Sequence, residues 1–335
     1  MNVNVPANRS ELTIAHANSL SSHLTGARLK DFLFGKFILF NAVLAISTIF
    51  LIFIYVGKEA IPIFYDAETR KEASLHRLFA PQDYGSPDMP LPFVWQPVGE
   101  VPKYSVLPLF LGTLKVTIIA LLFGAPLAIA AALYTAEFAS HRVREIVKPV
   151  VELLAGIPSV VLGFLALIVF ATWLQDLFGF DYRLNAVTAG IAMALAIIPI
   201  IYTVSEDALT SVPRTYREAS LALGVAPWKT AWSVVLPAAT PGIFAALILG
   251  FGRAMGETMV VLMASGNAAI TSLRLTDSVR TISATIAAEL GEVVFQSPHY
   301  YVLFFLGAML FVLTFLLNML GEYFVANLKR KLMGR

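Results

Sequence analysis

The chain has 335 residues and no cysteine; 58% of its residues are hydrophobic and only 14% are charged. Soluble domains are about 45–50% apolar and about 25% charged, so this composition excludes an ordinary soluble domain, a disordered chain and a disulfide scaffold. A formal net charge of +2 gives no reason to expect a nucleic-acid partner. The composition therefore predicts an all-α, polytopic membrane protein.

The predicted elements are apolar stretches long enough to cross a bilayer, which requires about 20 residues each. Six occur, at 37–57, 105–136, 149–175, 185–206, 237–265 and 299–325. They lack the period-2 alternation of strands, which argues against a transmembrane β-barrel. Pro158 and Pro199 interrupt two of them, and each proline is expected to kink its helix.

The polar segments between these stretches complete the predicted organisation. Residues 1–36 form an N-terminal segment, in which 1–27 are expected to be a mobile tail and no signal peptide is expected, because the first apolar run begins so late. Segment 58–104 contains seven prolines and is expected to be an irregular extracytoplasmic loop. A core over 105–325 and a basic tail over 326–335 follow.

The distribution of lysine and arginine predicts the orientation. One side of the membrane would hold 14 of these residues, in 1–36, 137–148, 207–236 and 326–335. The other side would hold eight, in 58–104, 176–184 and 266–298. Because basic residues are in excess in cytoplasmic segments, we expect both termini to be cytoplasmic.

Motifs of several enzyme classes are missing from the sequence. There is no G-x-x-x-x-G-K-[ST] loop, no H-E-x-x-H pair and no G-x-S-x-G turn, and the five histidines are scattered. We therefore expect no catalytic residue, no cofactor and no metal site in this chain. If ATP drives the protein, another chain must bind the nucleotide.

The connecting segment 207–236 is predicted to fold rather than merely to link two spans. A short helix should begin at Arg214, just after a proline, and should end at Gly224, which suits the position after a helix C-terminus. Pro227 should open a second short helix. We call this predicted helix–turn–helix the knuckle, residues 214–232. Its small central residues would let a helix sit deep in a groove of another protein.

The knuckle resembles the "EAA" loop of ABC-importer permeases. The match consists of Glu218-Ala219-Ser220, Gly224, Val234 and Leu236-Pro237, with Ser220 in place of the usual alanine and Val234 in place of the usual isoleucine. The resemblance implies a type I ABC-importer permease fold, in which this loop docks in a cleft of a separate ATPase subunit. It would make Arg217, Glu218, Ala219, Ser220 and Gly224 the coupling residues. The alternative is a solvated amphipathic hairpin.

Two charged residues lie deep in the fifth predicted span. Arg253 and Glu257 are four residues apart, so on one helix they would share a face and lie within reach of each other. Charges at membrane depth cost about 2.5–3.5 kcal/mol each on insertion scales and usually face a bundle interior or a water-filled path. They would form either a structural ion pair or, together with Thr258, part of a translocation path for an anion.

The chemistry of this pair is compatible with an oxyanion such as phosphate, although the residues alone do not identify the cargo. A guanidinium binds phosphate oxygens through its fork of donors. The carboxylate of Glu257 could accept a hydrogen bond from a protonated phosphate oxygen, which sulfate at neutral pH does not offer. These roles are hypotheses at this point.

Four further segments narrow the resemblance. Residues 252–258 (GRAMGET), 152–164, 278–293 and 95–114 are similar to phosphate ABC-importer permeases, and most similar to their C-type subunits. The resemblance implies a bacterial inner-membrane complex with a second, A-type permease, two copies of a cytoplasmic ATPase and an extracytoplasmic phosphate-binding protein. It does not extend to the N-terminal tail or to residues 66–92.

A helix is predicted to begin near Ser278 in the segment 266–298. Ile282, Ile286 and Leu290 would form one apolar stripe on it, with Thr281, Ser283 and Thr285 off the stripe. It would be either a surface helix packed on the bundle or a cap over the path that touches the binding protein, with Arg280, Thr281 and Thr285 near that contact. Arg280 could attract an anion.

Lys115, in the second predicted span, would either extend its amine to the outer interface or line the path. Other functions stay open from the sequence. The cargo could be another oxyanion or an organophosphate. An ion-coupled secondary carrier would leave the knuckle unexplained and usually shows internal repeats, which we do not find. An intramembrane enzyme would need a catalytic constellation that the sequence lacks.

Overall fold

The computed structural model describes residues 9–82 and 92–333, with side chains for 30–82 and 92–330. Within this part of the chain the secondary structure is helical, apart from two isolated bridges that pair Gln96 with Lys103 and Gly266 with Val279. The predicted all-α class is confirmed. The chain divides into two units, Met1–Val56 and Gly57–Arg335.

The helices in chain order are α1 (Arg9–Ala60), α2 (Pro62–Tyr65), α3 (Ala67–Ala73), α4 (Leu75–Phe79), α5 (Leu107–Glu137), α6 (His141–Ala155), α7 (Ser159–Leu165), α8 (Ala171–Phe178), α9 (Ala186–Thr210), α10 (Arg214–Ala222), α11 (Pro227–Thr230), α12 (Leu236–Gly256), α13 (Met259–Ala264), α14 (Ile282–Glu289) and α15 (Pro298–Met333). Two π-helical turns, η1 (Ala166–Phe170) and η2 (Ala231–Val235), join α7 to α8 and α11 to α12.

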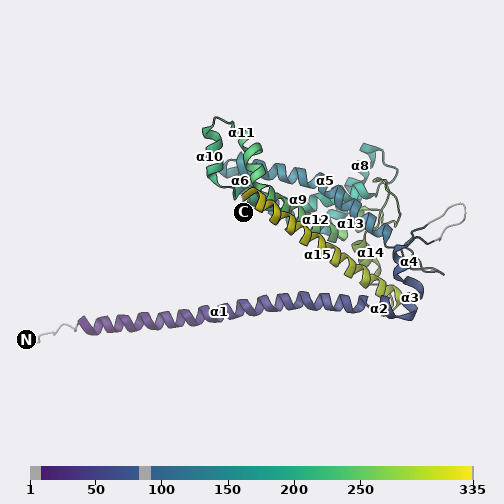
Figure 1. The fold of residues 1–335 in the computed structure, drawn as a ribbon, viewed down its shortest axis with the longest axis horizontal. Coiled ribbons are helices and arrows are strands. Elements are labelled where there is room, and N and C mark those ends of the chain that lie inside the picture. The colour runs from purple at the N-terminus through teal and green to yellow at the C-terminus, as the bar shows by residue number, and fades with distance from the viewer. Residues whose placement is uncertain (1–8, 83–91, 334–335) are drawn as a thin grey trace, which may run out of the picture. The chain divides into compact units, whose positions relative to one another are not determined.

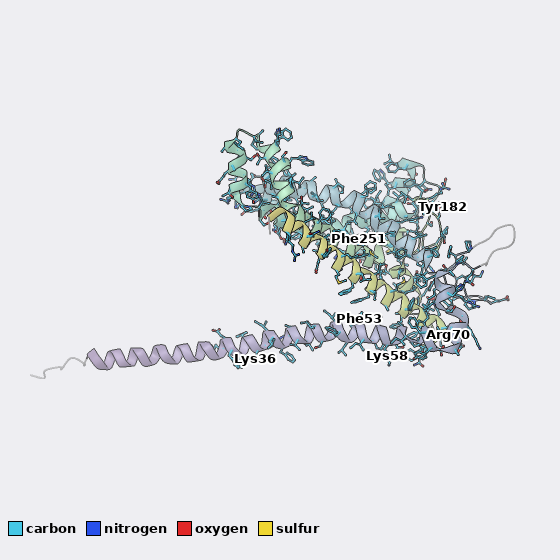
Figure 2. The ribbon with its side chains drawn as sticks, viewed as in Figure 1. Lys36, Phe53, Lys58, Arg70, Tyr182 and Phe251 are labelled. Carbon is cyan, nitrogen blue, oxygen red and sulfur yellow. The ribbon has the colours of Figure 1, made fainter. Side chains whose placement is uncertain are left out.

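Six candidate membrane spans occur among the described residues, as the sequence predicts. They are Lys30–Tyr65, Leu107–Glu137, Ser159–Phe178, Ala186–Thr210, Pro227–Gly256 and Pro298–Arg330. Large side chains project from the surface of the helices (Figure 2), and many of them are apolar and exposed, including Leu122 on α5 and Phe164 on α7. Such surface is expected to face lipid or another membrane-embedded chain.

The first span differs from expectation at its start. Residues 1–27 were expected to be a mobile tail, but α1 already begins at Arg9 and continues to Ala60; residues 1–8 lie outside the described part. No proline occurs between Arg9 and Ala60 to interrupt the helix. Pro62 then occupies the first position of α2.

The third span begins later than predicted. Residues 149–158 belong partly to α6, which is a separate helix with no buried residue, and the chain leaves helical geometry at Gly156–Pro158 before α7 begins at Ser159. Pro158 has φ −58° and ψ 136°, so it breaks the helix rather than kinking it. Pro199 has the weaker effect, since it lies inside the continuous helix α9.

The fifth span is predicted over 237–265. It begins earlier, at Pro227, and passes through η2 into α12, which ends at Gly256. Glu257 has an extended backbone, with φ −68° and ψ 133°, and α13 follows from Met259. The charged stretch of this span therefore lies at a helix break.

Small residues hold the centre of the second unit together. α5 and α9 pack side by side through buried alanines, including Ala120 and Ala189. A Cβ atom at Gly190 would collide with the side chain of Ile119, so glycine is needed at this contact. Close helix packing through small residues is typical of membrane proteins.

The proline-rich segment 58–104 is more ordered than predicted. Its described residues include the short helices α2, α3 and α4, and Trp95 and Tyr104 are buried against Val302 and Leu303 of α15. Figure 1 shows these short helices at one end of the bundle and α6, α10 and α11 at the other end, where α15 also ends. We refer to the latter as the α10 end.

Candidate functional site

The knuckle forms as its local sequence predicts. Gly224 follows α10 with a positive φ of 76°, which is the left-handed conformation that glycine adopts most easily. Pro227 is the first residue of α11. The Oγ atom of Ser220 and the Oγ1 atom of Thr230 are 2.9 Å apart, so a hydrogen bond joins the two short helices. The knuckle is thus a fixed shape rather than a loose connector.

Ser220 was expected to help the knuckle sit in a partner's groove, but it is only 7% exposed and faces α11. Its hydroxyl, which the usual alanine would lack, stabilises the turn from within. Glu218 and Ala219 are exposed. Ser220 therefore faces the interior of the knuckle and not a partner, whereas Glu218 and Ala219 remain accessible.

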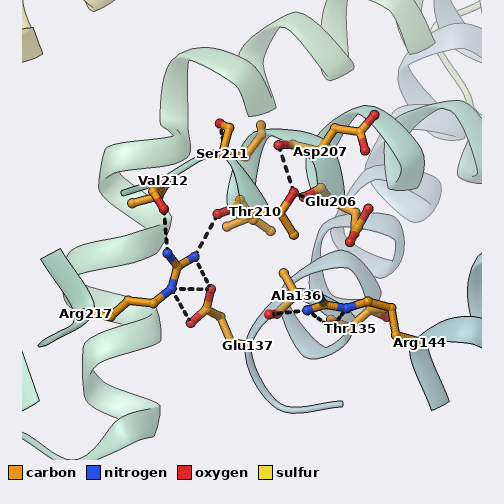
Figure 3. Close-up of polar contacts among 12 residues, drawn as sticks. Thr135, Ala136, Glu137, Arg144, Glu206, Asp207, Thr210, Ser211, Val212 and Arg217 are labelled. Carbon is orange, nitrogen blue, oxygen red and sulfur yellow. Dashed lines mark hydrogen bonds and ion pairs between the residues drawn. The ribbon is translucent and has the colours of Figure 1, made fainter. Parts of the chain in front are cut away.

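Arg217 also points inward (Figure 3). Its guanidinium donates to both carboxylate oxygens of Glu137, with a shortest contact of 2.6 Å, and to the carbonyl oxygens of Val212 at 2.6 Å and Leu209 at 2.9 Å. Glu137 is the last residue of α5, and Leu209 lies in the last turn of α9. Arg217 therefore fastens the knuckle to the ends of two long helices and is not part of its outer surface.

The outer surface of the knuckle combines apolar, aromatic and charged groups. Leu223 is 84% exposed, Trp228 66% and Tyr216 52%, and Glu218 and Ala219 lie on exposed positions beside them. A short helix that shows apolar anchors of this kind can occupy a groove in another protein. This face, rather than Arg217 or Ser220, is available for docking.

Sequence reasoning missed a second cluster at the α10 end. The amine of Lys148 on α6 lies 3.1 Å from Oε2 of Glu206 and 3.2 Å from Oδ1 of Asp207, both near the end of α9. Arg144, also on α6, donates to the carbonyl oxygens of Thr135 and Ala136 at the end of α5 (Figure 3). The available signal was Glu206 itself, an acidic residue at the end of an apolar span.

The helix break corrects the predicted pair in the fifth span. Because Glu257 has left the helix, which ends at Gly256, it does not share a helical face with Arg253. Both side chains are described, and no ion pair joins them. Oε1 of Glu257 accepts a hydrogen bond from the Thr258 amide at 3.2 Å, and its carbonyl accepts one from Ser283 at 2.8 Å. Arg253 is exposed, and no hydrogen bond or ion pair to it is found among the described residues.

An open hollow of about 540 Å³ lies at this break. Its lining includes Gly256 and Thr258 from the break, Ser283 and Ile286 from α14, and Leu310 from α15. Two hydroxyl side chains thus face a space beside Glu257. A hollow with hydroxyl groups in a mainly apolar lining, at a broken membrane helix, can hold or pass a small polar solute.

The three residues predicted to lie near a contact with the binding protein take different positions from those expected. Arg280 pairs with Glu289, with Nη1 2.6 Å from Oε1, and donates to Asn267 at 3.0 Å, so its charge is not free to attract an anion. Thr281 and Thr285 are 2% and 0% exposed. Thr281 is the N-cap of α14, and its carbonyl oxygen accepts a hydrogen bond from the Thr285 hydroxyl. In this chain these two threonines are buried and are not accessible to a docking protein.

The structure also changes the predictions for Lys115 and for the helix in the segment 266–298. The amine of Lys115 extends to the outer segment, but it donates to the carbonyl of Arg274 at 3.1 Å and is 8% exposed, so it does not end in water. Helix α14 begins at Ile282, later than predicted, and its polar residues Ser283 and Thr285 are buried together with Ile282. Of the predicted apolar stripe, Ile286 is only half-buried and Leu290, just past the helix, is exposed. Among the described side chains, Glu289 is the carboxylate that pairs with Arg280, and it also accepts a hydrogen bond from Trp95.

Residues 124–333 match the family of binding-protein-dependent transport system inner membrane components. The chain is 35% identical over 235 residues to a probable ABC transporter permease protein, YqgH, of Bacillus subtilis, covering 70% of this chain and 76% of that protein. It is 34% identical to the phosphate transport system permease protein PstC of Mesorhizobium japonicum, with the same coverage, and 34% identical to PstC 1 of Mycobacterium tuberculosis, covering 71% and 76%.

The fold also resembles solved transporters. A chain of the inward-facing MetNI methionine ABC transporter superposes with a TM-score of 0.50 at 19% identity, covering 67% of this chain and 94% of that chain. At this level of identity the likeness concerns the fold.

Proposed function

Because the chain belongs to the family of binding-protein-dependent transport system inner membrane components, we propose that it is a permease subunit of an ATP-driven importer of inorganic phosphate. Curated relatives at 34% identity are phosphate transport system permease proteins. Membrane subunits of ABC transporters are not enzymes, and a separate ATPase subunit hydrolyses ATP. The observation that carries the proposal is the knuckle, whose exposed face and rigid attachment suit the coupling of a motor to long membrane helices.

The proposal assigns the α10 end to the cytoplasm. The excess of lysine and arginine on the side of 1–36, 137–148, 207–236 and 326–335 supports this orientation, with both termini cytoplasmic. A cytoplasmic ATPase would then meet the face formed by Tyr216, Glu218, Ala219, Leu223 and Trp228. The finer composition of the complex, with one A-type permease, two ATPase copies and an extracytoplasmic phosphate-binding protein, is part of the same proposal.

The translocation path would pass the helix break at Glu257. Arg253 supplies an exposed cation with no described partner, which favours an anion nearby. Thr258 and Ser283 supply hydroxyls at the hollow beside the break. The Glu257 carboxylate could accept a hydrogen bond from a protonated phosphate oxygen. A carboxylate close to the path would also keep the arginine from holding the anion permanently. The partner permease would complete the lining, since Arg253 is open to the surface of this chain.

The test is uptake of radiolabelled phosphate by the reconstituted complex with its binding protein. We expect uptake that requires ATP, stops with a hydrolysis-deficient ATPase partner, and is competed by arsenate much more than by sulfate. Uptake without any ATPase would overturn the importer assignment. Equal competition by sulfate would overturn the assignment of phosphate and point to an ABC permease for a different oxyanion.

A further inference from the structure

Three cationic side chains hold the α10 end together. Arg217 of α10 and Arg144 of α6 both bind the last turn of α5, through Glu137 and through the carbonyls of Thr135 and Ala136. Cations at helix C-terminal ends are favoured because the carbonyl groups there are unpaired and carry partial negative charge. α6 and the knuckle are therefore attached to the same helix end from two sides.

The end of α9 is held in the same way. Arg217 binds the Leu209 carbonyl, while Lys148 of α6 binds Glu206 and Asp207. The Glu206 side chain is only 4% exposed, whereas the side chains of Lys148 and Asp207 are 37% and 62% exposed. A buried carboxylate needs a compensating charge, and within the described residues Lys148 is the cation paired with Glu206. This contact therefore ties α6 to the end of α9.

The far end of α6 leads directly to the helix break in the fifth span. After Ala155 the chain turns at Gly156–Pro158 and enters α7. α7 packs on the first turn of α13 at Gly163, where an added Cβ would lie 3.0 Å from the Met259 carbonyl oxygen and 3.2 Å from the Val260 Cα. Met259 follows Glu257 and Thr258 by only one or two residues. A displacement of α6 would thus reach the proposed path through one turn and one close contact.

We propose that α6 is a lever that carries the movement of the knuckle to the break at Glu257 and Thr258. The Lys148–Glu206 contact ties α6 to the end of α9, where Arg217 also holds the knuckle, and so makes α6 move with the knuckle. This inference rests on the proposed function. In it Lys148 and Glu206 are positioning residues: neither touches the transported anion or the ATPase. Movement of the knuckle then reaches the break by two routes. One is direct, along α11, η2 and α12, and the other passes through α6 and α7.

The first experiment measures coupling in the reconstituted complex. Lys148→Glu and Glu206→Lys should each lower the phosphate transported per ATP hydrolysed by about fivefold or more, in the range of typical coupling free energies. The ATPase rate stimulated by the binding protein should persist. The double exchange, Lys148→Glu with Glu206→Lys, should restore most of the ratio, and Lys148→Arg should keep it. Arg142→Glu makes the same charge change at an exposed position of α6 and should leave the ratio unchanged.

The second experiment measures the movement itself and needs no phosphate. The chain has no cysteine, so pairs of spin labels can be introduced without a background. Labels at Arg142→Cys and Arg214→Cys should keep one distance with and without nucleotide. Labels at Arg142→Cys and Leu273→Cys, the latter exposed in the outer segment, should change distance. In the Lys148→Glu variant, the distribution of distances between the labels at residues 142 and 214 should broaden or shift on nucleotide binding.

The outcomes separate this inference from the proposed function. If sulfate or another anion is the cargo, the label distances still report whether α6 follows the knuckle. The lever is overturned if α6 stays fixed while the rest of the complex responds to nucleotide. It is also overturned if both single charge changes leave the transport-to-hydrolysis ratio unchanged, or if they lower thermal stability and the double exchange restores stability without restoring the ratio.

Discussion

Arg217 of α10 and Glu137 of α5 are 80 residues apart in the sequence, yet they form an ion pair with a contact of 2.6 Å. Both side chains are largely buried, at 21% and 9% exposure. The pair connects the knuckle to the end of a helix that runs the length of the bundle. Because Arg217 also donates to the Leu209 carbonyl of α9, a force on the knuckle acts on α5 and α9 together.

Breaking this pair should detach the knuckle. Arg217→Met leaves Glu137 poorly solvated and unpaired, so we expect a loss of about 3 kcal/mol in the free energy of unfolding. Thermal unfolding in detergent checks the loss. Asp181→Asn is the control, because its pair with Arg274 is 66% and 68% exposed and should contribute less than about 1 kcal/mol. Equal effects of the two changes would contradict the buried role of Arg217.

The exposed face of the knuckle should decide ATPase binding. Leu223→Asp places a charge where an apolar anchor is 84% exposed, so it should abolish co-purification of the ATPase while thermal stability of the permease stays unchanged. Leu273→Asp makes the same change at an equally exposed site in the outer segment and should not affect co-purification. Normal ATPase binding by the Leu223 variant would remove this face from the proposed interface.

Arg253 should matter for transport and little for folding. It makes no described polar contact, so Arg253→Gln should stop uptake in an assembled complex without lowering thermal stability. Glu257→Gln should lower uptake and reduce the preference for phosphate over sulfate. If both variants transport normally, the path does not pass these residues.

Gly112 should tolerate no side chain. A Cβ there would collide with the carbonyl oxygen of Arg280, a backbone atom that cannot move aside easily. Gly112→Ala should therefore destabilise the protein by about 1–3 kcal/mol. Gly57→Ala, in a helix with open space around the Cβ position, should be neutral or slightly stabilising. The two melting temperatures in parallel test this packing.

The attachment of α6 should be insensitive to pH near neutrality. The hydrogen bond to Glu206 raises the pKa of Lys148 above its ordinary value. A cation with a raised pKa stabilises the fold at lower pH, and its contribution is lost only as pH rises through that raised value, above about 10.4. The contribution of this contact to the free energy of unfolding should therefore stay constant from pH 6 to 9.

Lys148→His moves this titration into an accessible range. An ordinary histidine titrates near pH 6.5, so the variant should be more stable at pH 5.5 than at pH 8, relative to the parent protein. The measurement is the difference in melting temperature between the two proteins across that range. An unchanged difference would mean that residue 148 does not hold Glu206.

The sequence by itself determined the all-α class, the six spans and the shape of the knuckle. These features depend on local physics: apolar runs long enough for a bilayer, a glycine that accepts positive φ after α10, and a proline that begins α11. Each acts within a few residues, so no knowledge of distant contacts is needed to predict it. The family resemblance of the 218–237 pattern is local in the same sense.

Only the tertiary structure decided which way the functional side chains face. Arg217 and Ser220 point inward because the ends of α5 and α9 and the helix α11 lie beside them. Lys148 meets Glu206 across 58 residues of sequence. Burial and long-range pairing depend on which helix ends meet in space, and side-chain spacing along one helix carries no information about that. For the same reason the break at Glu257, which separates it from Arg253, was visible only in the folded chain.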